Sequence, residues 1–142
     1  MKRVLFLCTG NSCRSQMAEG WMRSIGGAEY EVYSAGTRPM GINPLAVAAM
    51  SEAGVDISGQ TSSHVDEYTG QEFALVITVC DNARESCPVF PGDTVSLHWG
   101  FDDPADATGS DDERMVVFRR VRDDIREKIS HYLSSVRSND RS

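Results

Sequence analysis

A stretch near the N-terminus, CTGNSCRS at positions 8–15, combines a cysteine with an arginine at a spacing suited to oxyanion chemistry. The apolar run at residues 4–7 precedes it and predicts a strand, and a helical pattern begins at Ser15. Five residues between Cys8 and Arg14 let the chain curl so that successive backbone N–H groups point into one cup above the sulfur. Such a cup at a helix N-terminus attracts a tetrahedral oxyanion.

The residues of this stretch divide into a nucleophile and groups that bind an oxyanion. Arg14 supplies two N–H donors in one plane, which match two oxygens of such an anion. The positive field of the cup favours the thiolate of Cys8, so we expect a lowered pKa for this thiol and a nucleophile near neutral pH. A cysteine that merely packs at a strand end is the alternative, but the strand–loop–helix context argues for chemistry. The expected oxyanion-binding residues are Thr9, Gly10, Asn11, Ser12, Cys13 and Arg14.

A second pair of cysteines, Cys80 and Cys87, follows the apolar run at residues 73–79. If the segment between them is helical, their Cα atoms lie about 10 Å apart, whereas a disulfide needs roughly 7 Å or less. A bond between them would require this segment to unwind and would be easily reduced, as catalytic disulfides are. Two buried structural cysteines, or a zinc site with His98, are the alternatives. A thiolate nucleophile at Cys8 favours redox chemistry.

Composition indicates a soluble globular protein of the cytoplasm. The chain has 142 residues, of which 40% are hydrophobic and 25% charged, so we expect a single domain over residues 1–142. The net charge of −7 argues against nucleic acid and anionic membranes as partners. The apolar run at residues 4–7 is too short for an export signal or a membrane helix. Four cysteines without an export signal fit a reducing compartment.

The elements that must position these residues alternate between strand and helix. We expect strands at residues 3–8, 30–35, 73–79 and 94–99. We expect helices at residues 15–26 and 44–54, a short one near 63–70, and a long final helix that opens with a capping box at 110–113. This order predicts a parallel sheet with helices on both faces. Cys8, Cys80 and the acidic loop at 102–103 then follow carboxyl ends of strands, where ligands bind in such folds.

The chain resembles the thioredoxin-coupled arsenate reductases, which share the low-molecular-weight protein tyrosine phosphatase fold. The resemblance rests on CTGNSCRS at 8–15, SAGT at 34–37, GINPLAVAAM at 41–50, VCDNARESCP at 79–88 and Asp103-Pro104. The first and third segments are shared with the phosphatases, whereas the cysteines at 80 and 87 are typical of the reductases. The resemblance implies an α/β fold of three layers, with a four-stranded parallel sheet in the order 2-1-3-4 and helices on both faces.

The resemblance also implies a relay of three thiols that detoxifies arsenate. Cys8 would attack arsenate to form a covalent adduct, Ser15 would steady the thiolate, and Asp103 would protonate the departing oxygen. Cys80 would then attack the Cys8 sulfur and release arsenite, and Cys87 would form a Cys80–Cys87 disulfide that thioredoxin reduces. A protein reductant cannot reach a buried sulfur, so the oxidation has to be carried outward.

The expected ligands and partners follow from the same resemblance. The substrate is arsenate, with phosphate or sulfate as competing oxyanions. The reductant is thioredoxin, no cofactor is implied, and we expect a monomer. Some relatives bind potassium through residues matching Asn11, Glu19 and Ser34 plus a further acid, but the fourth position falls on Ser63, which weakens the case for a metal here. We expect Asn11 to brace the loop in a left-handed turn against Ser34.

Three alternative functions remain open. A tyrosine phosphatase would need only Cys8, Arg14 and Asp103, and weak phosphatase activity is expected because phosphate and arsenate share a geometry. Phosphatases of this fold place an aromatic residue just after the Asp-Pro pair, however, where this chain has Ala105-Asp106. A reductase that passes arsenic to a small thiol generally lacks the full cysteine pair. A binding or sensing module without turnover would not need the general acid.

Overall fold

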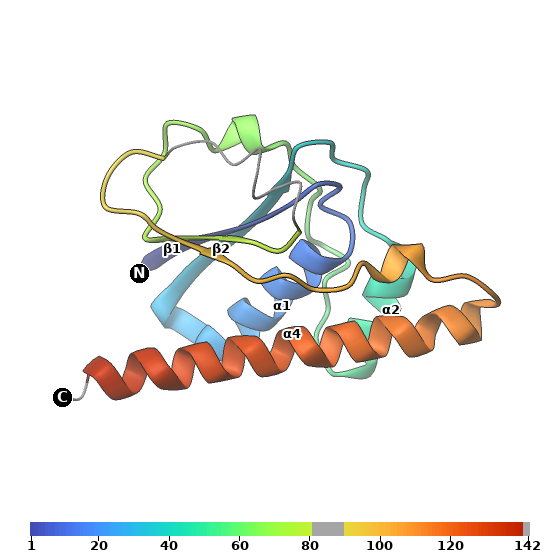
Figure 1. Ribbon diagram of the computed structural model, residues 1–142. Helices are drawn as coiled ribbons and strands as arrows, with labels where there is room; N and C mark the ends of the chain where they lie inside the picture. Colours follow the sequence, from blue (N-terminus) through green and yellow to red (C-terminus); the bar gives the residue numbers. More distant parts are fainter. Residues whose placement is uncertain (81–89, 141–142) are drawn as a thin grey trace.

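The structure is a computed structural model that describes residues 1–80 and 90–140 (Figure 1). Its sheet has four parallel strands in the order β2-β1-β3-β4, as the resemblance implied. The strands are β1 (Lys2–Cys8), β2 (Tyr30–Gly36), β3 (Leu75–Thr78) and β4 (Val95–His98). The helices are α1 (Arg14–Gly26), α2 (Pro44–Glu52) and α4 (Asp111–Asp140), and there are 3-10 turns at η1 (Gly27–Glu29), η2 (Val65–Glu67) and η3 (Pro104–Asp106).

The two central strands, β1 and β3, are continuous apolar runs. The residues at 4–7 and 75–77 are at most 4% exposed. Strands that are covered on both faces have this composition, because neither face meets water. The two strands pair in parallel, so their carboxyl ends lie at the same edge of the sheet. Cys8 ends β1 at this edge, and Cys80 comes shortly after β3.

The two faces of the sheet have different covers. The long helix α4 lies along α1 on one side (Figure 1), where the Phe6 ring of β1 also contacts Trp99. On the opposite face the Tyr33 ring of β2 contacts the rings of Tyr68 and Phe73, which lie between η2 and β3 in the sequence. Among the helices described, none combines the length and the hydrophobicity that crossing a bilayer requires.

The helix expected near residues 63–70 is a single 3-10 turn, η2. His64 caps this turn with a capping box that includes Glu67, so the start signal is present. The turn is not continued, because Gly70 adopts a φ of 86° and the chain then turns so that Phe73 reaches Tyr33. The segment between the second pair of cysteines, which we considered as a helix, lies outside the described residues.

Candidate functional site

The loop from Cys8 to Arg14 joins β1 to α1 at the carboxyl edge of the sheet. At its centre Asn11 is fully buried and adopts a φ of 45°, the left-handed turn that we expected. Its Nδ2 donates to Ser34 Oγ at 2.9 Å and to Ser15 Oγ at 2.8 Å, and its Oδ1 accepts from Ser63 N at 2.8 Å. The predicted contact with Ser34 is therefore confirmed.

Three carbonyl groups of the loop accept hydrogen bonds from backbone amides of the segment at residues 38–43. Those of Thr9, Gly10 and Ser12 accept from the amides of Arg38, Met40 and Asn43 at 2.8, 2.9 and 3.1 Å. The amides of residues 10–13, by contrast, donate to no acceptor within the described part of the chain. In a trans peptide the C=O and the following N–H point in opposite directions, so carbonyls held outward leave the amides facing inward. This arrangement at the start of α1 can bind an oxyanion.

The loop also brings together two thiols from distant parts of the chain. Cys8 is 4% exposed and Cys80 is 6% exposed. The Cys80 thiol forms a hydrogen bond with the Cys8 thiol, and its sulfur lies 3.3 Å from Thr9 Oγ1. The amide of Val79 donates to the carbonyl of Leu7 at 2.9 Å, which continues the pairing of β1 with β3 up to the residue before Cys80. Strand pairing therefore places the second thiol beside the first.

The pKa of Cys8 is raised above its ordinary value, contrary to our expectation of a thiolate near neutral pH. The hydrogen bond with Cys80 is the largest cause, followed by burial. The positive charge of Arg14 and the backbone N–H of Thr9 act in the opposite direction and lower this pKa. The prediction considered the positive groups of the loop but not a thiol contact that arises only from the pairing of β1 with β3.

Arg14 is held by the chain that follows β4. Its Nη1 donates to the carbonyl of Phe101 at 3.0 Å, and its Nη2 lies 3.4 Å from Asp103 Oδ2. The Asp103 carboxylate also caps η3, where Oδ1 accepts from Ala105 N at 3.0 Å. Arg14 Nε is buried and has no hydrogen-bond partner among the described residues. A buried donor of this kind is costly to leave unpaired, and an oxygen of an oxyanion held by the loop would satisfy it.

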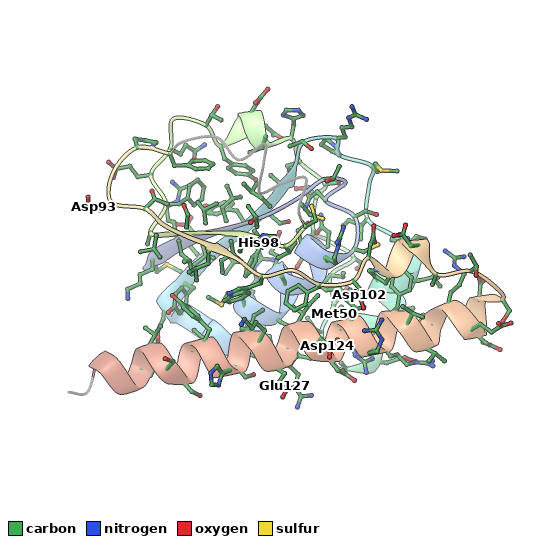
Figure 2. The ribbon with its side chains drawn as sticks, viewed as in Figure 1. Met50, Asp93, His98, Asp102, Asp124 and Glu127 are labelled. Atoms are coloured by element: carbon green, nitrogen blue, oxygen red, sulfur yellow. The ribbon has the colours of Figure 1, made fainter. Side chains whose placement is uncertain are left out.

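The neighbouring acid, Asp102, turns away from the loop. It pairs with Arg120 of α4 at 3.2 Å, and Arg120 in turn lies 3.5 Å from Asp124. Figure 2 shows Asp102 where the chain passes over α4, close to Asp124. Its carboxylate is exposed, so of the two adjacent acids only Asp103 reaches Arg14.

Two further residues of the predicted site are buried beside the loop. Ser15 accepts the hydrogen bond from Asn11, and within the described structure it makes no bond to Cys8. Burial raises the pKa of Cys13 to about 11, although Ser12 lowers it through a side-chain hydrogen bond. Cys13 therefore remains a protonated thiol at neutral pH.

The residues considered for potassium bond to one another instead. Ser34 Oγ donates to Glu19 Oε1 at 2.6 Å, and Arg23 Nη2 lies 2.8 Å from Glu19 Oε2. Burial raises the pKa of Glu19, and Ser34 and Arg23 partly offset this. Both carboxylate oxygens are engaged and Arg23 supplies the positive charge, so this cluster does not fit a monovalent cation. The described residues also contain no group of three or more His, Cys, Asp or Glu side chains placed to hold a metal ion.

Several contacts of the site had no signal in the sequence. The hydroxyl of Thr9 faces Cys80, and the side chains of Gln16 and Ser62 both donate to the carbonyl of Asn11. Thr9 and Ser62 are common polar residues whose partners come from distant segments, and Gln16 reaches a backbone carbonyl five residues earlier, so no motif indicates these contacts. The predicted Cys87 lies outside the described residues.

Comparison with known proteins places the chain in a family. The family model for low molecular weight phosphotyrosine protein phosphatases matches residues 3–142. An arsenate reductase of Halalkalibacterium halodurans is 53% identical over 131 residues, which cover 92% of this chain and 94% of that protein.

Two solved structures extend the comparison. An arsenate reductase in a phosphate-binding state is 34% identical, with a TM-score of 0.75, and the match covers 95% of this chain and 98% of that one. The thioredoxin-dependent arsenate reductase of Corynebacterium glutamicum is 27% identical, with a TM-score of 0.70, and the match covers 98% of this chain and 63% of that one. This chain therefore belongs to the low molecular weight phosphotyrosine protein phosphatase family, in the group that contains the arsenate reductases.

Proposed function

We propose that this protein reduces arsenate to arsenite with its own thiols and that thioredoxin returns it to the reduced state. The observation that carries the proposal is the hydrogen bond between the Cys8 and Cys80 thiols, beside a loop whose amides at 10–13 have no acceptor in the part of the chain that the structure describes. A phosphatase needs only the first thiol, whereas a reductase needs a second one within reach of it. The names of the relatives at 53% and 34% identity support the same chemistry.

The first step is the formation of a covalent adduct. The Cys8 sulfur, as thiolate, bonds to the arsenic of arsenate, and one arsenate oxygen leaves as water after it takes up protons. Arg14 and the amides of residues 10–13 hold the remaining oxygens. Asp103, whose carboxylate lies 3.4 Å from Arg14, is the group proposed to protonate the leaving oxygen. The Ser15 hydroxyl is proposed to donate to the thiolate.

The second step transfers two electrons to arsenic. The Cys80 thiolate attacks the Cys8 sulfur, the sulfur–arsenic bond breaks, and its electron pair remains with arsenic, which leaves as arsenite. A Cys8–Cys80 disulfide is formed. The Thr9 hydroxyl, 3.3 Å from the Cys80 sulfur, can donate to this thiolate and favour it.

The third step moves the disulfide to where a protein can reach it. Cys8 and Cys80 are 4% and 6% exposed, so a disulfide between them is sheltered from thioredoxin. In the proposal Cys87 attacks Cys80, Cys8 is released as a thiolate, and the dithiol of thioredoxin then reduces the Cys80–Cys87 disulfide.

The experiment is arsenate-dependent oxidation of NADPH in the presence of thioredoxin and thioredoxin reductase. We expect turnover by the wild-type protein and none by Cys80→Ser. Cys87→Ser should release one arsenite per protein and stop as a Cys8–Cys80 disulfide, which mass spectrometry of the unreduced protein would detect.

Two outcomes would contradict the proposal. Repeated turnover by Cys87→Ser with thioredoxin would show that the order of the thiols is wrong. Hydrolysis of para-nitrophenyl phosphate by a wild-type protein that fails to reduce arsenate would favour the phosphatase, which uses Cys8, Arg14 and Asp103 alone.

A further inference from the structure

Ser62 links three segments around the Cys8–Arg14 loop. Its hydroxyl donates to the carbonyl of Asn11 at 3.0 Å and lies 3.4 Å from the carbonyl oxygen of Gly10. The same hydroxyl accepts a hydrogen bond from the amide of Gly41 at 3.2 Å. Gly41 belongs to the stretch at residues 38–43, whose amides hold the other carbonyls of the loop. Ser62 therefore ties the loop to the segment that surrounds it.

The carbonyl of Asn11 differs from its neighbours in the kind of donor that holds it. Those of Thr9, Gly10 and Ser12 accept from backbone amides. Asn11 O accepts from two side chains, Ser62 Oγ and Gln16 Nε2, each at 3.0 Å. A side-chain substitution can therefore remove a donor here without altering the backbone.

The direction of this carbonyl determines the direction of one amide of the oxyanion site. Asn11 C=O and Ser12 N–H belong to the same planar trans peptide and point in opposite directions. The two donors hold the carbonyl on the outer side of the loop, so the Ser12 amide is turned inward. Without them the peptide can rotate and lose its alignment with a bound oxyanion.

We propose that Ser62 is a positioning residue for the oxyanion site, which keeps the Asn11–Ser12 peptide oriented with its N–H toward the bound anion. The inference rests on the proposed function, because it takes the loop as the place where the oxyanion binds. Gln16 still holds the same carbonyl when Ser62 is replaced, so the Asn11–Ser12 peptide loses one of its two hydrogen bonds.

The experiment measures binding of inorganic phosphate to the reduced full-length protein by isothermal titration calorimetry. We expect Ser62→Ala to weaken binding about three- to tenfold, the range for one net hydrogen bond. Ser62→Thr keeps the hydroxyl and should bind as the wild type does. The matched control is Ser58→Ala, since within the described residues Ser58 bonds only to Asp56 on the same stretch of chain.

Steady-state kinetics with arsenate separate positioning from a general structural role. We expect the KM of Ser62→Ala to rise by the same factor as the phosphate dissociation constant, with kcat and the melting temperature little changed. The inference would be overturned by any of three results. Ser62→Ala could bind phosphate as the wild type does, Ser62→Thr could lose as much phosphate affinity as Ser62→Ala, or the lower affinity could be explained by loss of folded protein. A wild-type protein that neither binds phosphate nor reduces arsenate would instead overturn the proposed function.

Discussion

At the scale of single residues, the reactivity of Cys8 depends on neighbours with opposite effects. Arg14 and the Thr9 amide favour the thiolate, whereas Cys80 and burial favour the thiol, and the net effect is a raised pKa. The hydrogen bond with the Cys80 thiol is thus the largest of the effects that oppose ionisation of Cys8. Cys80, which is proposed to attack the adduct, therefore also raises the pKa of Cys8 before the substrate binds.

Replacing Cys80 by alanine should lower the pKa of Cys8, because it removes the largest contribution that raises it. The measurement is the rate of Cys8 alkylation by iodoacetamide as a function of pH, followed on the Cys8 peptide by mass spectrometry. The midpoint should move to lower pH, and alkylation at pH 7 should be faster than in the wild type. Cys13→Ala serves as the control and should leave the profile of Cys8 in place. A midpoint that does not move in Cys80→Ala would show that the contact with Cys80 does not raise this pKa.

Replacing Asp103 by asparagine should slow adduct formation while oxyanion affinity is largely kept. Asparagine retains a side-chain oxygen that can accept from Ala105 N and so preserve the cap of η3, but it cannot supply the proton. We expect at least a tenfold fall in the single-turnover rate of arsenite release, with phosphate binding within about twofold by calorimetry. Asp106→Asn, on the same turn, is the control. An unchanged rate in Asp103→Asn would mean that the proton comes from another group.

The role of a residue can be predicted from the sequence where its backbone conformation favours only a few residue types. Asn11 was predicted in a left-handed turn against Ser34, and both features are present. The raised pKa of Cys8 was not predicted, because it depends on a distance between two side chains from different strands. The hydrogen bonds of Ser62 and Gln16 to the carbonyl of Asn11 were missed as well, because no sequence motif indicates them.

At the scale of elements, the site depends on a close approach between β2 and the loop after β1. Gly36 ends β2, and a Cβ atom at this position would lie 2.5 Å from the carbonyl oxygen of Thr9 and 2.9 Å from the amide of Asn11. These are backbone atoms of the Cys8–Arg14 loop, which cannot move aside as the end of a flexible side chain can. The strand and the loop can be this close only because Gly36 has no side chain.

Replacing Gly36 by alanine should therefore distort the loop. We expect phosphate binding to fall at least tenfold and the free energy of unfolding to fall by about 1–3 kcal/mol, as overpacking does. Calorimetry and urea denaturation measure the two effects. Gly59→Ala is a matched control, because nothing lies within 4 Å of a Cβ at Gly59. Wild-type affinity in Gly36→Ala would show that the loop tolerates a displacement of Thr9 and Asn11.

Elements were predicted well where burial dictates their composition. The apolar runs of β1 and β3 and the capping box before α4 indicated their elements within a few residues. The helix expected near residues 63–70 was wrong, because only the 3-10 turn η2 forms there and Gly70, at a φ of 86°, does not continue it. Start signals are local, whereas the length of a short helix depends on what its side chains contact.

The net charge of the protein opposes the approach of an anion to the proposed oxyanion site. The chain carries a formal charge of −7, so an anionic substrate is repelled at long range and attracted only near the loop. The positive charge of Arg23 is already used to pair with Glu19. Screening by salt should therefore help the substrate approach.

Raising the ionic strength from 20 to 150 mM should increase kcat/KM for arsenate about two- to threefold, because the Debye length shortens and the repulsion weakens. Potassium, sodium and choline chlorides should act equally, since the Glu19 cluster has its own cation in Arg23. Steady-state rates in the three salts at matched ionic strength make the comparison. An increase that potassium alone produces would mean that a cation binds the protein specifically.

The way the loop carbonyls are held has a consequence for how the protein matures on the ribosome. Cys8 is synthesised early, but the amides of residues 38–43 and the hydroxyl of Ser62, which orient the loop, follow much later. A nascent chain that ends before these residues contains Cys8 but lacks the groups that orient the loop amides. Because a domain folds as a unit, the loop is oriented only when these later segments have been synthesised and the sheet has formed.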